Sequence, residues 1–466
     1  MSTAPSHESD AFALRSERVL VGGKFESALV VVRGERIEAV MPPHADIGPN
    51  VAVHDVGNHV LMPGLVDTHV HVNEPGRTEW EGFETATRAA ASGGITTIVD
   101  MPLNCSPVTT STRALDQKLA SLAGSSPTPG NELYIDTAFW GGAIPNNQHE
   151  LRSLAEAGVR GCKAFLIDSG IDEFPHVGEE DLRLAMRELE RAGIPLIAHA
   201  ELDVGAPAAA SNDVRRYSHY LASRPPEWEV AAIELLIRLC RETGCPVHIV
   251  HLSAAAAIPL IQAAKASGLP LTAETCPHYL CLHAEDIPDG ATNYKCAPPI
   301  RDRDNCDKLW QALREGVLDA VVSDHSPCAP ALKKLDVGDF MQAWGGIASL
   351  SLGLGTVWHE AFARGFEPAT MGLWMSERTA KLAGLSGKKG SIARGADADF
   401  VVWDPDAEME IGPDLLFFKH KQSPFVGRKA RGRVMETWLR GRRIFDIGEG
   451  KPNFGPTAGK SINSRR

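Results

Sequence analysis

The stretch that decides the fold reads Gly64-Leu65-Val66-Asp67-Thr68-His69-Val70-His71-Val72-Asn73-Glu74-Pro75-Gly76. It places two histidines two residues apart in a run rich in valine. Alternate side chains of a β-strand lie on one face, so His69 and His71 are expected to point the same way. Two imidazoles side by side suit a borderline metal ion such as zinc. From this stretch alone, ordinary buried or surface histidines are an equal alternative.

Outward from this stretch, apolar β-like runs alternate with helix-like segments. Strand candidates lie at residues 64–72, 95–102, 133–142, 161–168, 195–201, 247–253, 271–279 and 318–327. Helical spacing of apolar residues is clear over residues 180–191, 227–243 and 305–315. Strands separated by helices pair in parallel, and eight of them predict an α/β fold, the closed (β/α)₈ or TIM barrel. A doubly wound open sheet is the alternative, but no glycine-rich dinucleotide motif follows an early strand.

Both ends of the chain carry short β-like runs of another kind. They lie at residues 18–21, 28–33 and 36–40, and again at 390–392, 398–403 and 432–439. We expect residues 11–60 and 389–446 to form one small β-sandwich domain, with the barrel at residues 61–388 between them. Residues 1–10 are expected to be disordered, and residues 447–466 to form a polar C-terminal tail.

Composition limits the class of protein. The chain has 466 residues, 43% of them hydrophobic and 23% charged, which is typical of a soluble globular protein. A net charge of −12 disfavours nucleic acid or an anionic membrane as the partner. No apolar run is long enough to span a membrane, and the polar N-terminus has no signal pattern. Nine cysteines without paired spacing indicate free thiols in a reducing compartment, so the cytoplasm is expected.

Polar residues recur where the predicted barrel strands end. They are His69, His71, Lys163, His199, His251 and Asp324. Each has a structural explanation by itself: an edge lysine, a core histidine, an aspartate that caps the next helix. Because chemistry in a barrel collects at the C-terminal ends of its strands, the set as a whole predicts one site.

Lys163 is unusual in this set because an ammonium group cannot bind a metal ion. Burial beside cations should lower its pKa and leave a neutral amine. A neutral amine can take up carbon dioxide and become a carbamate, whose two oxygens can bridge two metal ions. The sequence therefore suggests a binuclear site.

Several motifs resemble those of the cyclic amidohydrolases, a group in the amidohydrolase superfamily. The resemblance runs from about residue 12 to 446. Its motifs are residues 67–83 (DTHVHVNEPGRTEWEGF), 100–104 (DMPLN), 276–280 (CPHYL), 295–301 (KCAPPIR) and 323–327 (SDHSP). The branch that it resembles most opens the ring of allantoin to give allantoate.

The resemblance implies roles for these residues. His69, His71 and Asp324 would hold one metal ion, and His199 and His251 the second, with carboxylated Lys163 as the bridge. Two zinc ions are implied, although other divalent ions can substitute, and Asp324 would also act as the catalytic base. It further implies a small-molecule substrate and a homo-oligomer, often a homotetramer.

The substrate-binding residues are less defined. Dihydroorotases usually carry arginine two residues after the second histidine, where this chain has Asn73, so an uncharged ring such as allantoin is expected. Asn104 faces the substrate or is a turn residue. The resemblance to hydantoinases implies main-chain contacts near Ala297 and Gly345. Hydantoinase or dihydropyrimidinase activity and a non-catalytic scaffold of the same fold are the alternatives.

Four further residues carry predictions from their positions. His278 and His325 flank the site and are expected to have supporting or structural roles. His248 has the opposite strand parity to His251 and is expected to point away from it. Cys162, next to Lys163, is expected to pack on the other face of its strand.

Overall fold

The computed structural model describes residues 11–122, 133–205 and 213–463. The disorder expected for residues 1–10 concerns a segment outside these ranges. Within them, no helix is both long and apolar enough to cross a membrane. All nine cysteines are buried, and none forms a disulfide within these ranges.

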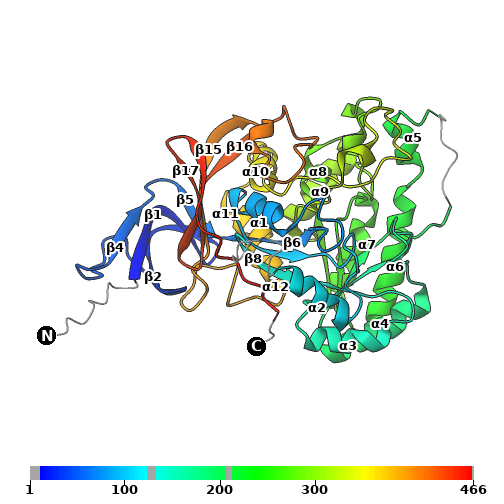
Figure 1. The fold of residues 1–466 in the computed structure, drawn as a ribbon, viewed down its shortest axis with the longest axis horizontal. Helices are drawn as coiled ribbons and strands as arrows, with labels where there is room; N and C mark the ends of the chain where they lie inside the picture. Colours follow the sequence, from blue (N-terminus) through cyan, green and yellow to red (C-terminus); the bar gives the residue numbers. More distant parts are fainter. Residues whose placement is uncertain (1–10, 123–132, 206–212, 464–466) are drawn as a thin grey trace.

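The larger part of the molecule is a closed parallel barrel, as predicted, which lies on the right in Figure 1. Its strands are β6 (Leu65–Val70), β7 (Ile95–Asp100), β8 (Asp136–Phe139), β9 (Gly141–Gly142), β10 (Cys162–Phe165), β11 (Leu196–His199), β12 (Val247–Ile249), β13 (Leu271–Thr275) and β14 (Ala320–Val321). β8 pairs with β7 and β9 with β10, so these two short strands share the third position of the barrel. A parallel bridge between Val70 and His325 joins the last strand to the first and closes the barrel.

Helices surround the barrel and connect its strands. They are α1 (Phe83–Ser92), α2 (Thr112–Ser121), α3 (Gln148–Glu156), α4 (Glu179–Ala192), α5 (Tyr217–Ala222), α6 (Pro226–Thr243), α7 (Ile258–Ala266), α8 (Pro277–Cys281), α9 (Arg303–Arg314) and α10 (Gly353–Ala363). Local sequence fixes their starts: the Ser111 hydroxyl caps α2, the Asp302 carboxylate caps α9, and Pro226 begins α6. The predicted helices at 180–191, 227–243 and 305–315 correspond to α4, α6 and α9.

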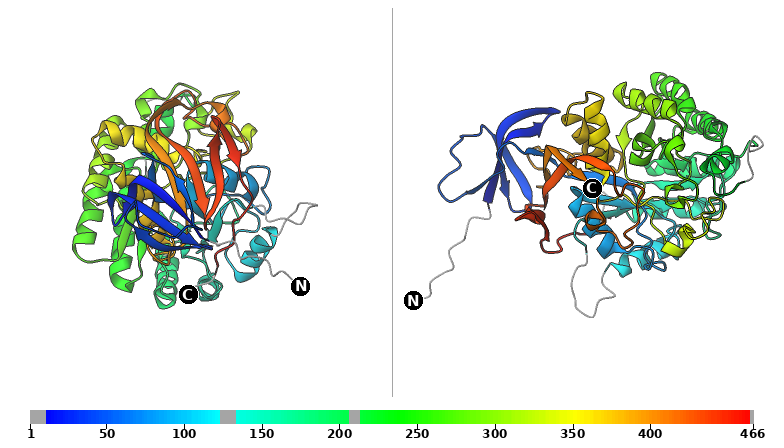
Figure 2. Two further views of the ribbon diagram at one scale, coloured as in Figure 1. Left: turned by 90° about the vertical axis from the view of Figure 1, so that its left-hand side faces the viewer. Right: turned by 90° about the horizontal axis from the view of Figure 1, so that it is seen from above.

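Both ends of the chain form one nine-stranded sheet beside the barrel, and Figure 2 shows the N-terminal strands in blue against the C-terminal strands in orange and red. The strands are β1 (Ala11–Val21), β2 (Lys24–Arg33), β3 (Arg36–Met41), β4 (Ala52–Asp55), β5 (Val60–Pro63), β15 (Phe400–Glu410), β16 (Lys429–Leu439), β17 (Arg442–Gly448) and β18 (Lys451–Phe454). Phe12 stacks on Trp438 with ring centroids 5.3 Å apart, although β5 and β15 lie between their strands in the sheet. The sheet therefore bends over onto itself, as in a sandwich.

Two terminal segments differ from expectation. Residues 390–392 form no strand. The segment expected as a polar tail forms β18 and then runs beside β8, where Thr137 N donates to Lys460 O at 2.9 Å and Ile462 N donates to Thr137 O at 2.8 Å. Side-chain polarity did not reveal this, because the main chain makes the pairing.

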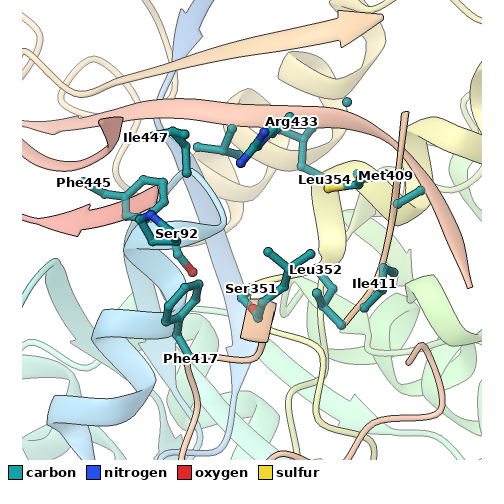
Figure 3. A pocket seen from close by; sticks show the side chains of 16 residues that line it. Ser92, Ser351, Leu352, Leu354, Met409, Ile411, Phe417, Arg433, Phe445 and Ile447 are labelled. Atoms are coloured by element: carbon teal, nitrogen blue, oxygen red, sulfur yellow. The ribbon is translucent and has the colours of Figure 1, made fainter. Parts of the chain in front are cut away.

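A small cavity of about 60 Å³ lies between the barrel and the sheet, under α10 and β16 (Figure 3). Its walls are mainly apolar and include Leu352, Ile411, Phe417 and Ile447. No histidine, cysteine or carboxylate lines it. This cavity therefore offers no acid, base or metal ligand.

A buried ionic cluster also joins the barrel to the sheet. The Lys389 ammonium lies 2.6 Å from Asp136 in β8, 2.6 Å from Asp399 and 2.9 Å from Asp397. These carboxylates together hold the pKa of Lys389 above its usual value against the effect of burial. A lysine in this position keeps three buried carboxylates paired.

Removing this ammonium should destabilise the protein strongly. We expect Lys389→Met to lower the free energy of unfolding by about 3–5 kcal/mol, because three buried carboxylates lose the cation that they share, and Arg440 and Arg36 pair only with two of them, Asp136 and Asp397. Urea denaturation followed by circular dichroism measures it, with Lys388→Met as the matched neighbour. A loss below about 1 kcal/mol in Lys389→Met would contradict the role of the cluster.

Candidate active site

The site residues predicted from sequence line one cavity of about 530 Å³ at the C-terminal ends of the barrel strands. The residues that it brings together are His69, His71, Asn104, Lys163, His199, His251, Ala297, Asp324 and Gly345. They come from segments up to 276 residues apart in the chain, which the closed barrel alone places side by side. The cavity is large enough for a small ring.

One group of donors forms at the closure of the barrel. Asp324 Oδ1 lies 3.2 Å from His69 Nε2 and 3.8 Å from His71 Nε2. One ligand atom from each residue lies within 4.8 Å of the other two. Two imidazoles and a carboxylate at this spacing can hold a divalent cation.

A second group lies across the cavity. His199 Nδ1 is 3.0 Å from His251 Nε2. The His251 ring is also 5.1 Å from the His69 ring, so the two groups are adjacent. Two facing imidazole nitrogens must share a proton or a cation, because two lone pairs repel each other.

Burial favours the uncharged form of the histidines in this site. Burial lowers the pKa of His71 to about 3 and of His199 to about 4. Burial, with the neighbouring charges, also holds the pKa values of His69 and His251 well below the usual range. Neutral imidazoles keep the lone pairs that metal binding needs, so the donor set fits a pair of divalent cations.

Lys163 lies in β10 with only 1% of its surface exposed. Burial lowers the pKa of Lys163 to about 8, although Asp324 and Glu274 act in the opposite direction. Its charge acts on His69, His71, His199 and Asp324, which places the amine at the centre of the site. A substantial neutral fraction near pH 7–8 fits the amine that a carbamate requires.

Two glutamates that the sequence analysis did not assign orient the imidazoles. Glu274 Oε1 lies 2.7 Å from His69 Nδ1, and Glu201 Oε2 lies 2.7 Å from His199 Nε2. Each contact leaves the other ring nitrogen facing the cavity. Both glutamates are buried, and a sequence signal existed for Glu201, a carboxylate two residues after a candidate ligand.

The orientation predicted for His248 is wrong. Its Nε2 lies 3.0 Å from Glu274 Oε2, so His248 sits inside the barrel below His69. His251 follows the end of β12 with φ of 39°, which breaks the strand alternation on which the prediction relied. Asp324 also has a positive φ, of 43°. Such backbone conformations are costly for residues other than glycine and gather at functional sites.

The two asparagines have different surroundings. Asn104 Nδ2 lies 3.3 Å from His71 Nδ1, and Asn104 lines the cavity. Asn73 does not line it: its φ is 67°, and its amide donates to Pro327 O at 3.1 Å. The expectation that Asn73 selects the substrate is therefore not supported by its position. Asn73 instead joins the loops that follow β6 and β14.

The flanking residues are buried around the site. His325 Nδ1 accepts from Ser349 N at 3.2 Å and its Nε2 lies 3.3 Å from Glu81 Oε2, which fits a structural role. His278 is buried near Cys276 and Asp324, and neither of its ring nitrogens has a partner among the described residues. Cys162 packs in the outer core, on the face of β10 opposite Lys163.

Ala297 and Gly345 lie next to each other in the cavity wall. A Cβ built on Gly345 would lie 3.8 Å from Ala297 N. The main-chain carbonyls on either side of Ala297 all accept hydrogen bonds. The donors are Gly346 N to Lys295 O, Tyr220 to Cys296 O, Tyr279 to Pro298 O, Ser253 to Pro299 O and Tyr217 to Ile300 O. Neither Ala297 nor Gly345 makes a main-chain hydrogen bond within the described residues. Unpaired main-chain groups in a cavity wall are available to a ligand.

The sequence is similar to one protein family and, within it, to allantoinases from several organisms. The sequence profile described as the amidohydrolase family matches residues 60–444. Allantoinase from Streptomyces avermitilis is 48% identical over 436 residues, which cover 94% of this chain and 96% of that protein. Allantoinase from Saccharomyces cerevisiae is 43% identical, with 97% and 99% covered.

Solved structures show the same fold. L-hydantoinase (dihydropyrimidinase) from Arthrobacter aurescens superposes with a TM-score of 0.88 at 27% identity, covering 97% of this chain and 100% of that chain. Dihydropyrimidinase from Brevibacillus agri superposes with a TM-score of 0.85 at 26% identity, covering 97% and 98%.

The role of Glu274 can be tested through metal binding. We expect Glu274→Gln to weaken zinc binding about 10–100-fold, because a carboxylate partner raises the basicity of a ligating imidazole. Competition with a chromophoric chelator measures the affinity. Glu285→Gln, on the exposed surface, is the control. An unchanged affinity in Glu274→Gln would show that His69 is not a ligand through Nε2.

Proposed function

The chain belongs to the amidohydrolase family, and from this premise we propose that it is an allantoinase, which hydrolyses the cyclic amide bond of allantoin to give allantoate. The observation that carries this proposal is the match to allantoinases of 42–48% identity over more than nine-tenths of the chain. The cavity contains a full set of residues for metal-dependent hydrolysis. That set also argues against a non-catalytic scaffold, which has no need to retain it.

Two divalent cations, with zinc as the expected ion, are proposed to occupy the site. His69, His71 and Asp324 would hold one, and His199 and His251 the other. Lys163, as a carbamate, would supply one oxygen to each. When bound, such a pair supplies hydroxide at neutral pH and polarises the amide carbonyl.

Asp324 is proposed as the catalytic base and acid. Burial raises the pKa of its carboxyl to about 7, despite the opposing charge of Lys163. A carboxylate in this position can accept the proton of the attacking water and pass it to the ring nitrogen that leaves. The C–N bond breaks, the water oxygen stays on the carbonyl carbon, and a carboxylate forms.

The cavity suits an uncharged ring because the cationic side chains in its wall already have partners; Asn73 does not contribute. Two cationic side chains line it beyond Lys163, and both are engaged. Arg224 pairs with Glu201, and the Lys295 ammonium donates to two main-chain carbonyls. The ring is proposed to bind the free main-chain groups of Ala297 and Gly345, with Asn104 beside it. A ring bearing a carboxylate, such as dihydroorotate, would need an unpaired cation.

Three finer assignments remain predictions. Zinc as the native metal is one, to be checked by elemental analysis of protein purified without chelators. A homotetramer is another, to be checked by light scattering. The third is a location in the cytoplasm, which fractionation of the source cells would check.

A panel of rings tests the substrate. We expect kcat/KM for allantoin to exceed the values for hydantoin, dihydrouracil and dihydroorotate by at least about tenfold, because pockets built around polar groups discriminate well. In Asp324→Asn, kcat should fall by about 10²–10⁴ as the proton carrier is lost. Faster turnover of hydantoin or dihydrouracil would instead favour the hydantoinase alternative that the structural relatives suggest.

Replacing the central lysine tests the carbamate. We expect Lys163→Ala to lose about a thousandfold in activity, since several kcal/mol of charge stabilisation depend on the paired cations. Added propionate should recover part of the activity, because a free carboxylate can supply the missing oxygens. Activity is followed together with metal content. Full activity in Lys163→Ala would contradict the carbamate assignment.

A further inference from the structure

The segment of residues 341–346 forms one wall of the active-site cavity. Met341, Ala343, Trp344, Gly345 and Gly346 all line it. The segment belongs to the loop after β14 and has no regular secondary structure. Because a loop wall is easily displaced, the contacts that hold it decide the shape of the site.

Two lysine ammonium groups hold this segment by its carbonyls. Lys295 Nζ donates to Met341 O at 3.1 Å and to Ala343 O at 2.7 Å. Lys333 Nζ donates to Trp344 O at 3.1 Å and also to Gly346 O. Two lysine side chains therefore hold four of the six main-chain carbonyls in the segment. The Gly345 carbonyl accepts no hydrogen bond within the described residues.

Neither lysine has a carboxylate partner within the described ranges of the chain. Lys333 is only 6% exposed, and burial lowers its pKa. Burial together with the charges of Arg224 and Lys333 lowers the pKa of Lys295 to about 8. Burying an ammonium without a counter-ion is expensive, so an apolar side chain would fill the Lys333 position at lower cost. The arrangement indicates that the carbonyl contacts themselves are needed.

Lys295 also connects the two walls that face the ring. Its main-chain carbonyl accepts from Gly346 N at 2.8 Å, and Ala297 follows it by two residues. One residue thus joins the segment that carries Ala297 to the segment that carries Gly345. Fixing both segments sets the distance between their unpaired main-chain groups.

We propose that Lys295 and Lys333 are positioning residues for substrate binding, which hold the Gly345 main chain at the right distance from Ala297. The proposal rests on the proposed function, because it assumes that a ring contacts the main chain of both residues. Hydrogen bonds from charged donors contribute more than neutral ones, so each lysine should matter measurably. Neither touches the metal-binding residues, so the chemical step should change little.

Steady-state kinetics on three variants tests the proposal. In Lys295→Met and in Lys333→Met, KM for allantoin should rise by about tenfold or more, while kcat stays within about threefold, the pattern of lost uniform binding. Lys334→Met is the matched control, because the Lys334 ammonium makes no hydrogen bond or ion pair within the described residues; its KM should stay within twofold of wild type, about the scatter of such measurements. Metal content is measured first and should equal that of wild type.

Hydrogen–deuterium exchange supplies a second readout that needs no substrate. The amides of Ala343, Trp344 and Gly346 are hydrogen-bonded, so a peptide covering residues 341–346 should exchange faster in Lys295→Met than in wild type or Lys334→Met. Lys295 is partly exposed, so Lys295→Met decides the question if Lys333→Met does not fold. Unchanged exchange, an unchanged KM, or a loss in kcat alone would overturn the proposal. If wild type does not open allantoin, the proposed function fails, and the exchange experiment still tests the two lysines.

Discussion

Four imidazole rings, one amine and the Asp324 carboxylate are held together, each of them buried, in the wall of one cavity. Crowding of this kind disfavours positive charge, so the pKa values of His69, His71, His199, His251 and Lys163 all fall. The result is a set of four imidazoles that favour the neutral form, and an amine with a substantial neutral fraction near pH 8, around one carboxylate. Such a set is poorly satisfied by hydrogen bonds alone, since His199 and His251 place two nitrogens 3.0 Å apart. Bound cations would relieve this repulsion, and the proposed chemistry would follow from them.

The barrel provides the site at a cost in backbone energy. His251 and Asp324 adopt positive φ angles, which turn both side chains into the cavity after their strands have ended. Glu274 and Glu201 then orient His69 and His199 from outside the cavity. The sheet supports the barrel through the buried cluster around Lys389, at the end of the barrel strands opposite to the site. The backbone strain at His251 and Asp324 is thus offset by packing and by paired charges in other parts of the fold.

Sequence reasoning was accurate where a regular pattern carries the information. Alternating strands and helices predicted the barrel, and the residues at the strand ends, from His69 to Asp324, do meet in one cavity. It failed where the backbone leaves that pattern. Because His251 has a positive φ, it lies inside the barrel without the strand alternation, and the opposite side that was expected for His248 was wrong. The C-terminal tail pairs with β8 through its main chain, which side-chain polarity does not indicate. Asn73 looked like a substrate contact but holds Pro327. Glu274 was not assigned because its partner His69 is 205 residues away in the chain.

Substrate recognition in this account depends on main-chain groups, which leave little trace in the residue types, and on the side chains that fix them. The proposed hydrolysis depends on whether the donor set holds two cations bridged by Lys163. The most direct test is a crystal structure of the zinc-loaded protein with anomalous scattering at the zinc edge. We expect two zinc ions roughly 3.5–4 Å apart, bridged by a carboxylated Lys163. A single zinc ion, or an unmodified Lys163 beside two, would contradict it.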